Sequence, residues 1–415
     1  MTSTPPKPAS PTPTPTVLSL VGERDALLNS IVYCAPGLKS ASAGPDANLI
    51  TIRTHAKKRM AEVSTFNGAI QCRAFVPLEK ITTHGRKLIM QYNQIQTTLD
   101  LTDKGDTINI TVPEDSSGMI SELQLKSKHG KYQIGLLDPD ALIVPAWDMD
   151  CVGMVDYSVM MRLFDKVRLM LDDSTQFIRL QAIQQPTTKK WYLRIFTRTH
   201  RMMGMFYVEA PELKREFTVY VPLFTFRKVK NLQSADIRVL LPKHKTDNLI
   251  GFESEDKLKR MVCGCEPESN QDVDDALEQF KGKPKNEFSW NIDLMHATLK
   301  RIEQFSAGRM NVRVPIGKTV ADVYTRNNKH AAAETVEVSG TEIGKHKEAF
   351  AMQYDTITMH MLHKLAGQVE NITVHYTKNE DLGGHPHIGM LDCFDKPIEG
   401  VAFRVVFSLA HGLDT

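Results

Sequence analysis

The sequence predicts an α+β protein made of three tandem copies of one unit, and three observations lead to that prediction. The chain has 415 residues, of which 41% are hydrophobic and 24% charged. These are globular proportions, and the length is enough for two to four domains. The order helix, strands, helix, strands recurs in each third of the chain, and such internal similarity is typical of repeated domains. A strand that ends in Val-Pro-Leu occurs at residues 75–78 and again at 220–223.

The first third shows the predicted unit in full. Apolar residues at helical spacing predict a helix over 23–34. Proline ends a strand and suits the first turn of a helix, so Pro77 favours a second helix over 78–91. Strands and hairpin-like pairs fill the rest of this third, at 48–53, 60–66, 70–76, 97–101, 107–112, 122–127 and 132–136.

The other two thirds repeat that order. In the second third we expect helices over 156–171 and 223–232, with strands at 177–183, 191–197, 203–208, 216–221, 236–241 and 249–253. In the last third we expect helices over 292–305 and 354–366, with strands at 311–315, 319–326, 334–338, 371–376, 387–393 and 402–409. The repeat therefore predicts three domains, at 17–150, 151–265 and 286–415.

Two segments lie outside the predicted domains. Residues 1–16 contain six prolines and no apolar core, so they are expected to form a disordered tail with polyproline II character. Residues 266–280 carry six acidic side chains and no basic one, and a lysine-rich stretch follows at 281–285. Together, residues 266–285 are typical of a solvated linker.

Composition excludes several classes of protein. Lys and Arg number 51 against 49 for Asp and Glu, which excludes a broadly polybasic protein, so any nucleic-acid contact must come from local charge. The six cysteines include no Cys-x-x-Cys pair, which favours a reducing cytosol. The sequence shows neither a signal peptide nor an apolar run near the roughly 20 residues of a membrane helix. We expect no membrane partner.

Motifs for catalysis, cofactors or metals are weak. The Gly-Lys-Thr at 317–319 lacks the upstream glycine of a phosphate-binding loop, because Val312 stands in its place. Three pairs supply too few ligands for a metal site: His360 with His363, His385 with His387, and Cys263 with Cys265. We therefore expect no catalytic residues, no cofactor and no metal.

The repeat and several local matches resemble the bacterial-type DNA polymerase sliding clamp, the β clamp. Residues 22–28 look like the opening helix of that family, and 132–147 look like its last domain-one strand and the crossover that follows. Residues 196–202, Phe-Thr-Arg-Thr-His-Arg-Met, are similar to the family's Thr-Asp-Gly-His-Arg-Leu, with Arg198 and Thr199 replacing Asp and Gly. Residues 403–409 are similar to its terminal strand. The resemblance covers 17–412.

The resemblance implies a fold and a function. It implies three clamp domains with helices lining an inner face and antiparallel sheets outside. Two chains would close into a homodimeric ring around duplex DNA, bound without regard to sequence. The ring would act as a processivity factor without chemistry of its own, binding DNA polymerase and a clamp loader through short peptide motifs. The location implied is cytoplasmic, at the nucleoid, or in a host cytoplasm if this divergent clamp is viral.

The resemblance also implies a partner-peptide pocket between the second and third domains. Carried over position by position, the pocket consists of apolar walls and a few polar groups: Ile178, Thr197, Thr199, His200, Met202, Pro222, Phe226, Val405 and Phe407. Two of these, Phe226 and Phe407, are bulkier than the family pattern, so the preferred peptide is expected to differ. Core packing is the alternative role of each apolar member.

Charge is compatible with a ring around DNA. The six expected inner helices carry a net positive charge, while the rest of the chain is net negative. A modest field suits a sliding ring, because each neutralised phosphate adds affinity and salt dependence. The cations expected to face DNA are Arg24, Lys80, Arg86, Lys87, Arg162, Lys166, Arg227, Lys228, Lys230, Lys300 and Arg301.

Two other functions remain open at this point. One is a clamp-fold scaffold that binds peptides but does not encircle DNA, which predicts a monomer. The other is an enzyme with an unrecognised site, which predicts turnover and a convergent polar cleft.

Overall fold

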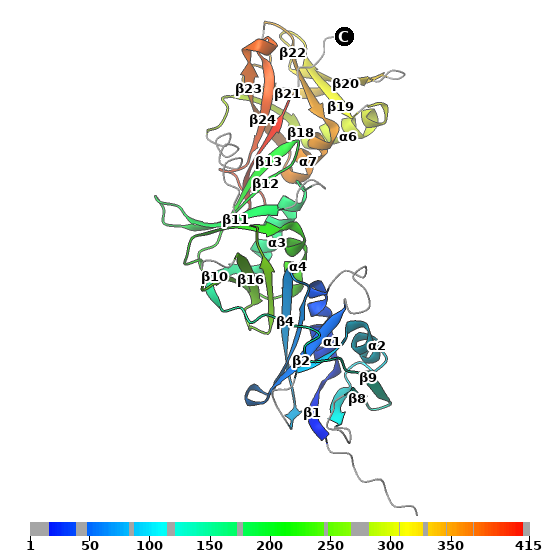
Figure 1. Cartoon of the computed structure of the whole chain (residues 1–415). Helices are drawn as coiled ribbons and strands as arrows, with labels where there is room; N and C mark the ends of the chain where they lie inside the picture. Colours follow the sequence, from blue (N-terminus) through cyan, green and yellow to red (C-terminus); the bar gives the residue numbers. More distant parts are fainter. Residues whose placement is uncertain are drawn as a thin grey trace, which may run out of the picture. The chain divides into compact units, whose positions relative to one another are not determined.

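The computed structural model describes residues 16–38, 48–82, 87–113, 121–171, 177–244, 248–266, 282–306, 308–326, 331–345, 347–367 and 369–409. The chain forms two compact units (Figure 1). Unit 1 comprises Met1–Asp150 and Lys228–Gly264, and unit 2 comprises Cys151–Arg227 and Cys265–Thr415. Strand β10 (Met149–Asp156) and helix α4 (Leu223–Val229) run from one unit into the other. The predicted tail at 1–15 and most of the acidic linker, 267–281, lie outside the described residues.

Unit 1 follows the predicted order with one change. Its elements are β1 (Thr16–Glu23), α1 (Arg24–Cys34), β2 (Leu49–His55), β3 (Met60–Phe66), β4 (Ile70–Pro77), β5 (Lys80–Ile81), β6 (Lys87–Gln91), α2 (Tyr92–Asp100), β7 (Thr107–Pro113), β8 (Glu122–Lys126), β9 (Lys131–Gly135), β15 (Asp236–Pro242), β16 (Leu249–Ser254) and β17 (Lys259–Gly264).

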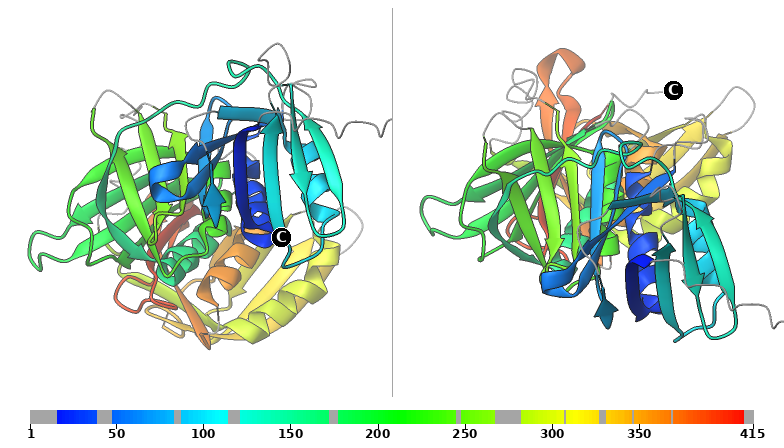
Figure 2. Two further views of the ribbon diagram at one scale, coloured as in Figure 1. Left: turned by 90° about the horizontal axis from the view of Figure 1, so that it is seen from below. Right: turned by 60° about the horizontal axis from the view of Figure 1, so that its bottom comes forward.

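Two antiparallel sheets build unit 1. The first has the order β5-β1-β7-β8-β9, and Figure 2 shows dark-blue β1 beside its cyan neighbours. The second contains β15-β16-β17-β4-β3-β2-β6. Helix α1 packs against β3 and β4 through a buried face that includes Leu27, Ile31 and Cys34. Burial of this apolar face, rather than helix propensity, stabilises the short helix.

Unit 2 contains the remaining elements. They are α3 (Tyr157–Arg168), β11 (Phe177–Gln184), β12 (Trp191–Arg198), β13 (Met202–Glu209), β14 (Phe217–Pro222), β18 (Asn286–Asn291), α6 (Ile292–Ile302), β19 (Arg309–Val314), β20 (Val320–Arg326), β21 (Ala331–Gly340), β22 (Phe350–Asp355), α7 (Thr356–Ala366), β23 (Asn371–Asn379), β24 (His385–Asp392) and β25 (Ala402–Ser408). Short 3-10 turns extend α4 over Lys230–Leu232 and α6 over Glu303–Phe305.

One twelve-stranded sheet runs through unit 2 in the order β14-β11-β12-β13-β25-β24-β23-β18-β21-β20-β19-β22. Its helix face carries Phe206, Phe403 and Phe407, which are almost fully buried. A Cβ on Gly204 would lie 2.5 Å from the Sδ atom of Met170, just beyond α3, and Trp290 donates a 3.1 Å hydrogen bond to His363 on α7. Helices α3 and α7 therefore cover this face. We call the opposite side of the sheet the far face.

The structure confirms the α+β fold and the threefold repeat, but it corrects one element. The helix expected over 78–91 is wrong: residues 87–91 form strand β6, paired with β2, and α2 occupies part of the expected strand at 97–101. Pro77 ends β4, and the backbone NH of Leu78 bonds back to the Arg59 carbonyl at 2.8 Å, which turns the chain away from a helix.

The equivalent strand-to-helix steps of the repeat are β6 to α2, β14 to α4 and β22 to α7. The Val-Pro-Leu match therefore aligns β4 with β14, which are not equivalent strands. Strands β1, β10, β17 and β18 were not predicted from the sequence. No helix among the described residues is long and apolar enough to cross a membrane.

Candidate functional site

The nine predicted pocket residues all belong to unit 2, and several of them meet where β12, β13 and β25 run side by side. Met202 pairs with Phe407 across the β13–β25 ladder, and Gly204 pairs with both Val405 and Thr197. Ile178 lies on β11 and pairs with Val221 of β14. The ladder register brings Thr197, Met202, Val405 and Phe407 around Gly204.

A tight turn holds the polar part of this region. The Thr199 hydroxyl accepts hydrogen bonds from the backbone NH groups of Arg201 (3.2 Å) and Met202 (3.1 Å), and the Thr199 NH donates to the Met202 carbonyl at 2.8 Å. Thr199 therefore fixes the loop between β12 and β13. The loop leaves His200 exposed. The Arg201 guanidinium lies 3.5 Å from a carboxylate oxygen of Asp355, which caps α7.

The apolar members form the floor of the region rather than an exposed surface. Ile178, Met202, Phe226, Val405 and Phe407 are each 0–7% exposed, whereas Pro222, at the end of β14, is half-buried. The Phe226 ring packs edge-on against Phe164 at 4.5 Å between centroids. Core packing therefore accounts for most of their contacts, and a peptide would meet them only at their edges.

Two features of this region were not found from the sequence. The Thr197 hydroxyl is buried and has no hydrogen-bond partner among the described residues, which is uncommon for a buried polar group. Gly389 of β24 makes room for the Phe407 ring, since a Cβ there would lie 2.4 Å from the Phe407 Cε2 atom. A glycine inside a strand is the signal that could have found this close approach.

The predicted DNA-facing cations divide into engaged and exposed groups. Lys87 lies on β6 rather than on a helix, and its ammonium donates to the carbonyls of Pro139 (2.9 Å) and Leu142. Arg24 is 12% exposed and binds the Leu99 carbonyl and the Asp25 carboxylate.

Lys166 is also engaged. Its buried ammonium donates to the Leu365 carbonyl at 3.2 Å and pairs with Glu399 at 3.1 Å. Arg24, Lys87 and Lys166 are thus engaged in hydrogen bonds or ion pairs within the chain.

Exposed cations remain on the helices of both units. Arg301 is paired with Glu334, and Lys80 is exposed on β5. Helix α2 carries Asp100 as its only charged residue, so it adds no positive charge. Arg86 and the side chain of Arg227 lie outside the described part of the structure. In addition to Arg301, the exposed cations on helices or their 3-10 extensions are Arg162, Arg168, Lys228, Lys230, Lys300 and Lys364.

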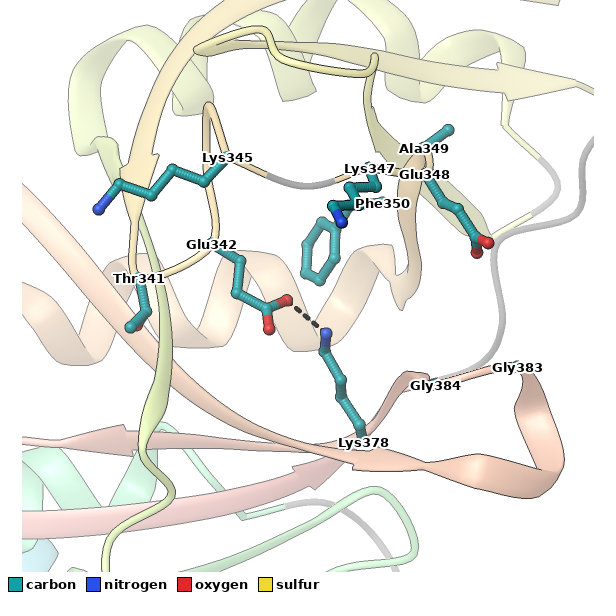
Figure 3. A pocket seen from close by; sticks show the side chains of 10 residues that line it. All are labelled: Thr341, Glu342, Lys345, Lys347, Glu348, Ala349, Phe350, Lys378, Gly383 and Gly384. Carbon is teal, nitrogen blue, oxygen red and sulfur yellow. Dashed lines mark hydrogen bonds and ion pairs between the residues drawn. The ribbon is translucent and has the colours of Figure 1, made fainter.

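A separate pocket of unit 2 lies near the loop before β22 (Figure 3). It is lined by Thr341, Glu342, Lys345, Lys347, Glu348, Ala349, Phe350, Lys378, Gly383 and Gly384. The Lys378 ammonium points to the Glu342 carboxylate and pairs with it. None of the predicted peptide-binding residues lines this pocket. Within the described ranges, no three His, Cys, Asp or Glu side chains are grouped as metal ligands.

Comparisons with known proteins agree on the fold. No family model matches the chain, and no curated protein matches it by sequence. Solved structures match over nearly the whole chain. A DNA polymerase sliding clamp from Caulobacter crescentus has a TM-score of 0.75 at 14% identity, covering 95% of this chain and 99% of that one.

Two further structures agree. The DNA polymerase III subunit beta of Pseudomonas aeruginosa has a TM-score of 0.75 at 11% identity, covering 95% of this chain and 100% of that one. The H. pylori beta clamp in complex with 5-chloroisatin has a TM-score of 0.72 at 12% identity, covering 94% and 99%. At this level of identity the likeness concerns the fold. This chain therefore has the fold of the bacterial DNA polymerase sliding clamps.

Proposed function

We propose that this protein is a DNA polymerase sliding clamp that acts as a homodimeric ring around duplex DNA and has no catalytic activity. Its three domains would be residues 17–150, 151–265 and 286–415, with the helices facing DNA. Partner proteins such as a polymerase and a clamp loader would dock short peptides beside the β13–β25 junction. One observation carries the proposal. The chain contains two strand junctions of the same kind, and the two strands that would form a third one, β9 and β21, each keep an edge that pairs with no described strand.

The junction joins equivalent strands of successive repeats. The third strand after the first helix of each repeat is β4, β13 or β21, and the last strand is β9, β17 or β25. In unit 1, β4 pairs with β17, and in unit 2, β13 pairs with β25, both antiparallel. The remaining strands of these two kinds are β21 and β9. A third junction of the same kind would pair β21 of one chain with β9 of another, and two such junctions close a dimer.

The backbone of both strands supports this pairing. β9 is the last strand of its sheet, and among the described strands residues 331–337 of β21 pair only with β20. In antiparallel ladders, residues alternate between pointing their NH and C=O groups at one neighbour and at the other. The Leu136 NH bonds to Ser121, and the Val338 NH bonds to Thr319. By alternation, Gln133 of β9 and Thr335 of β21 direct their backbone groups away from those neighbours.

Proline substitution at the edge tests the ring. We expect the unmodified protein to have a solution mass near twice 46.7 kDa by light scattering. Gln133→Pro removes an outward NH without touching the β8–β9 ladder, so it should shift the mass toward that of one chain. Gln133→Thr keeps the NH and is the matched control. A stable monomer of the unmodified protein at every concentration would instead favour the peptide-binding scaffold.

Retention on DNA tests the topology. A closed ring should remain on a nicked circular plasmid after loading and slide off once the plasmid is linearised. The exposed helix cations should affect retention weakly and in a salt-dependent way, because they contact phosphates only transiently. Equal retention on both plasmids would contradict encirclement.

The peptide site is best tested at exposed positions. Truncating Phe407 or Met202 would open a cavity in the core and lower stability, which confuses the result. His200 is exposed at the tip of the Thr199 turn, so His200→Ala should weaken binding of a partner peptide while leaving the unfolding temperature unchanged. Thr197→Val tests the buried hydroxyl. Lys190→Ala, elsewhere in the same unit and exposed, is the control. Unchanged affinity in both site variants would remove this pocket from the proposal.

A further inference from the structure

A buried lysine of the second repeat contacts two elements of the third repeat. Lys166 lies on α3 and is only 6% exposed. Its ammonium donates to the Leu365 carbonyl of α7 at 3.2 Å and lies 3.1 Å from the carboxylate of Glu399, in the connection between β24 and β25. A lysine is almost never buried without partners, and here both partners belong to the following repeat.

The first contact lies at the end of α7. The last four carbonyls of a helix have no partner inside that helix, and the helix dipole is negative at this end. The Lys166 ammonium satisfies one of these carbonyls, that of Leu365. Gly367 follows the helix with a φ of 66°, and a Cβ at that position would lie 3.5 Å from the Lys166 Nζ atom. Helix α7 therefore ends where the ammonium enters.

The second contact comes from a strained turn. Ile398 and Val401 exchange both backbone hydrogen bonds at 3.0 Å, and the two residues between them, Glu399 and Gly400, have φ values of 55° and 79°. Two left-handed central residues are typical of a type I′ turn, which prefers Asn or Asp at the first of them. Glutamate is unfavourable in this backbone conformation, so the turn alone does not explain Glu399. Strain of this kind points to a role for the side chain.

Apolar packing does not replace the ion pair. A pocket lies between α3 and the turn, lined by Arg162, Asp165, Lys166, Arg168, Leu169, Glu399 and Gly400. Open space therefore separates the turn from α3 around the pair. Within the described part of the chain, α7 packs on α6 of its own repeat and has no comparable contact with α3.

We propose that Lys166 and Glu399 form a latch that fixes the third repeat against the second. The β13–β25 ladder joins these repeats along one line only, and neighbouring strands can twist relative to each other by about −10 to −35°. The latch adds a second attachment away from the ladder, on the helix side of the sheet. Its purpose rests on the proposed function, because a ring closes only when successive repeats keep one fixed angle.

Double electron–electron resonance tests the latch within one chain. Spin-labelled amino acids replace Lys189 and Lys318, which are exposed at the β11–β12 and β19–β20 turns, one in each repeat. An excess of unlabelled chain removes distances between copies. Glu399→Asn should broaden the distance distribution at least about twofold, although Asn-Gly suits the turn better. Lys166→Met should act alike, whereas Asp395→Asn, exposed in the same connection, is the matched control and should change nothing.

The outcomes separate the latch from the ring. An unchanged width in Glu399→Asn would overturn the latch, and so would equal broadening in Asp395→Asn. Circular dichroism at the same temperature checks that each variant is folded. If the ring also forms, Glu399→Asn should shift the solution mass from two chains toward one at low concentration. A monomeric unmodified protein would contradict the ring, and the distance widths would still decide whether the latch exists.

Discussion

The two strand junctions of the chain have the same antiparallel pairing but differ in what lies on one of their faces. At β4–β17 of unit 1, Arg260 is the register partner of Arg73. The buried Glu253 carboxylate lies 2.6 Å from the Arg260 guanidinium and 3.0 Å from that of Arg238, and the side chains of Arg73 and Gln71 donate to the Pro145 carbonyl. At β13–β25 of unit 2, the comparable positions are Met203, Met205, Val406 and Arg404, and Arg404 is the charged one, with its guanidinium 3.1 Å from the Asp392 carboxylate.

The two junctions share one pattern of backbone pairing, but different kinds of side-chain contact stabilise them. At the polar junction, ion pairs with Glu253 and hydrogen bonds to the Pro145 carbonyl satisfy the charged and polar side chains. The apolar junction is completed by packing instead: Met205 and Val406 are 6% and 3% exposed, and burial of apolar area is what stabilises them. Backbone pairing defines each junction, and its side chains decide whether ion pairs or apolar packing contribute more to its stability.

The largest effect should come from breaking the polar junction. Glu253→Ala leaves two guanidinium groups without their carboxylate, so we expect the free energy of unfolding to fall by about 3 kcal/mol, measured by urea titration. Glu255→Ala, at an exposed position two residues away, is the control and should change stability little. Equal effects of both variants would show that the Glu253 ion pairs contribute nothing special.

The apolar junction should be sensitive to volume instead. Gly389→Ala places a methyl group against the Phe407 ring, and overpacking of this kind costs about 2 kcal/mol. Phe407→Leu in the same chain should recover part of the loss, since it removes the clashing ring atoms. Gly135→Ala on β9 is the matched control, because no atom lies within 4 Å of its Cβ position. Additive losses in the Gly389/Phe407 double variant would contradict the contact.

Protonation of His363 in unit 2 should have a smaller effect on the free energy of unfolding. Burial, with added repulsion from His296 and His360, lowers the pKa of His363 to about 4. The unfolded chain has the higher pKa, about 6.5, so it binds the proton first as the pH falls. Stability is therefore full above about pH 6.5 and declines toward pH 4, by about 1–2 kcal/mol at pH 5. His363→Gln should flatten this dependence in thermal unfolding between pH 5 and 7; an unchanged slope would assign it to other groups.

The smallest effect should come from a surface ion pair. Lys190 and Glu209 lie 3.0 Å apart across β12 and β13, and both side chains are about half exposed. Solvent screens such pairs, so Glu209→Gln should leave the unfolding temperature of the protein unchanged at ordinary salt. A clear decrease would mean that the stability of unit 2 depends on this exposed ion pair, as the stability of unit 1 is expected to depend on the buried Glu253.

Sequence reasoning located most elements because periodicity is local. The helices at α1, α3, α6 and α7 and most strands follow from apolar spacing alone, and the order of elements revealed the repeat. Misassignment of 78–91 has a physical cause: the run Leu88-Ile89-Met90 suits a buried strand and a helix equally, and only its pairing with β2 decides. The same limit applies to β17, whose partner β4 is almost 190 residues away in the sequence.

The same distinction, between what local sequence determines and what tertiary contacts decide, applies to the residues of the candidate site. The sequence by itself determined the α+β class, the threefold repeat and the residue types that could bind a peptide or DNA, because these depend on composition and local spacing. Only the tertiary structure decided that Lys87, Arg24 and Lys166 are engaged in hydrogen bonds and ion pairs, that Phe407 is buried against Gly389, and that two ladders join successive repeats. Those facts depend on contacts between segments far apart in the chain, and no local pattern encodes the distance between them.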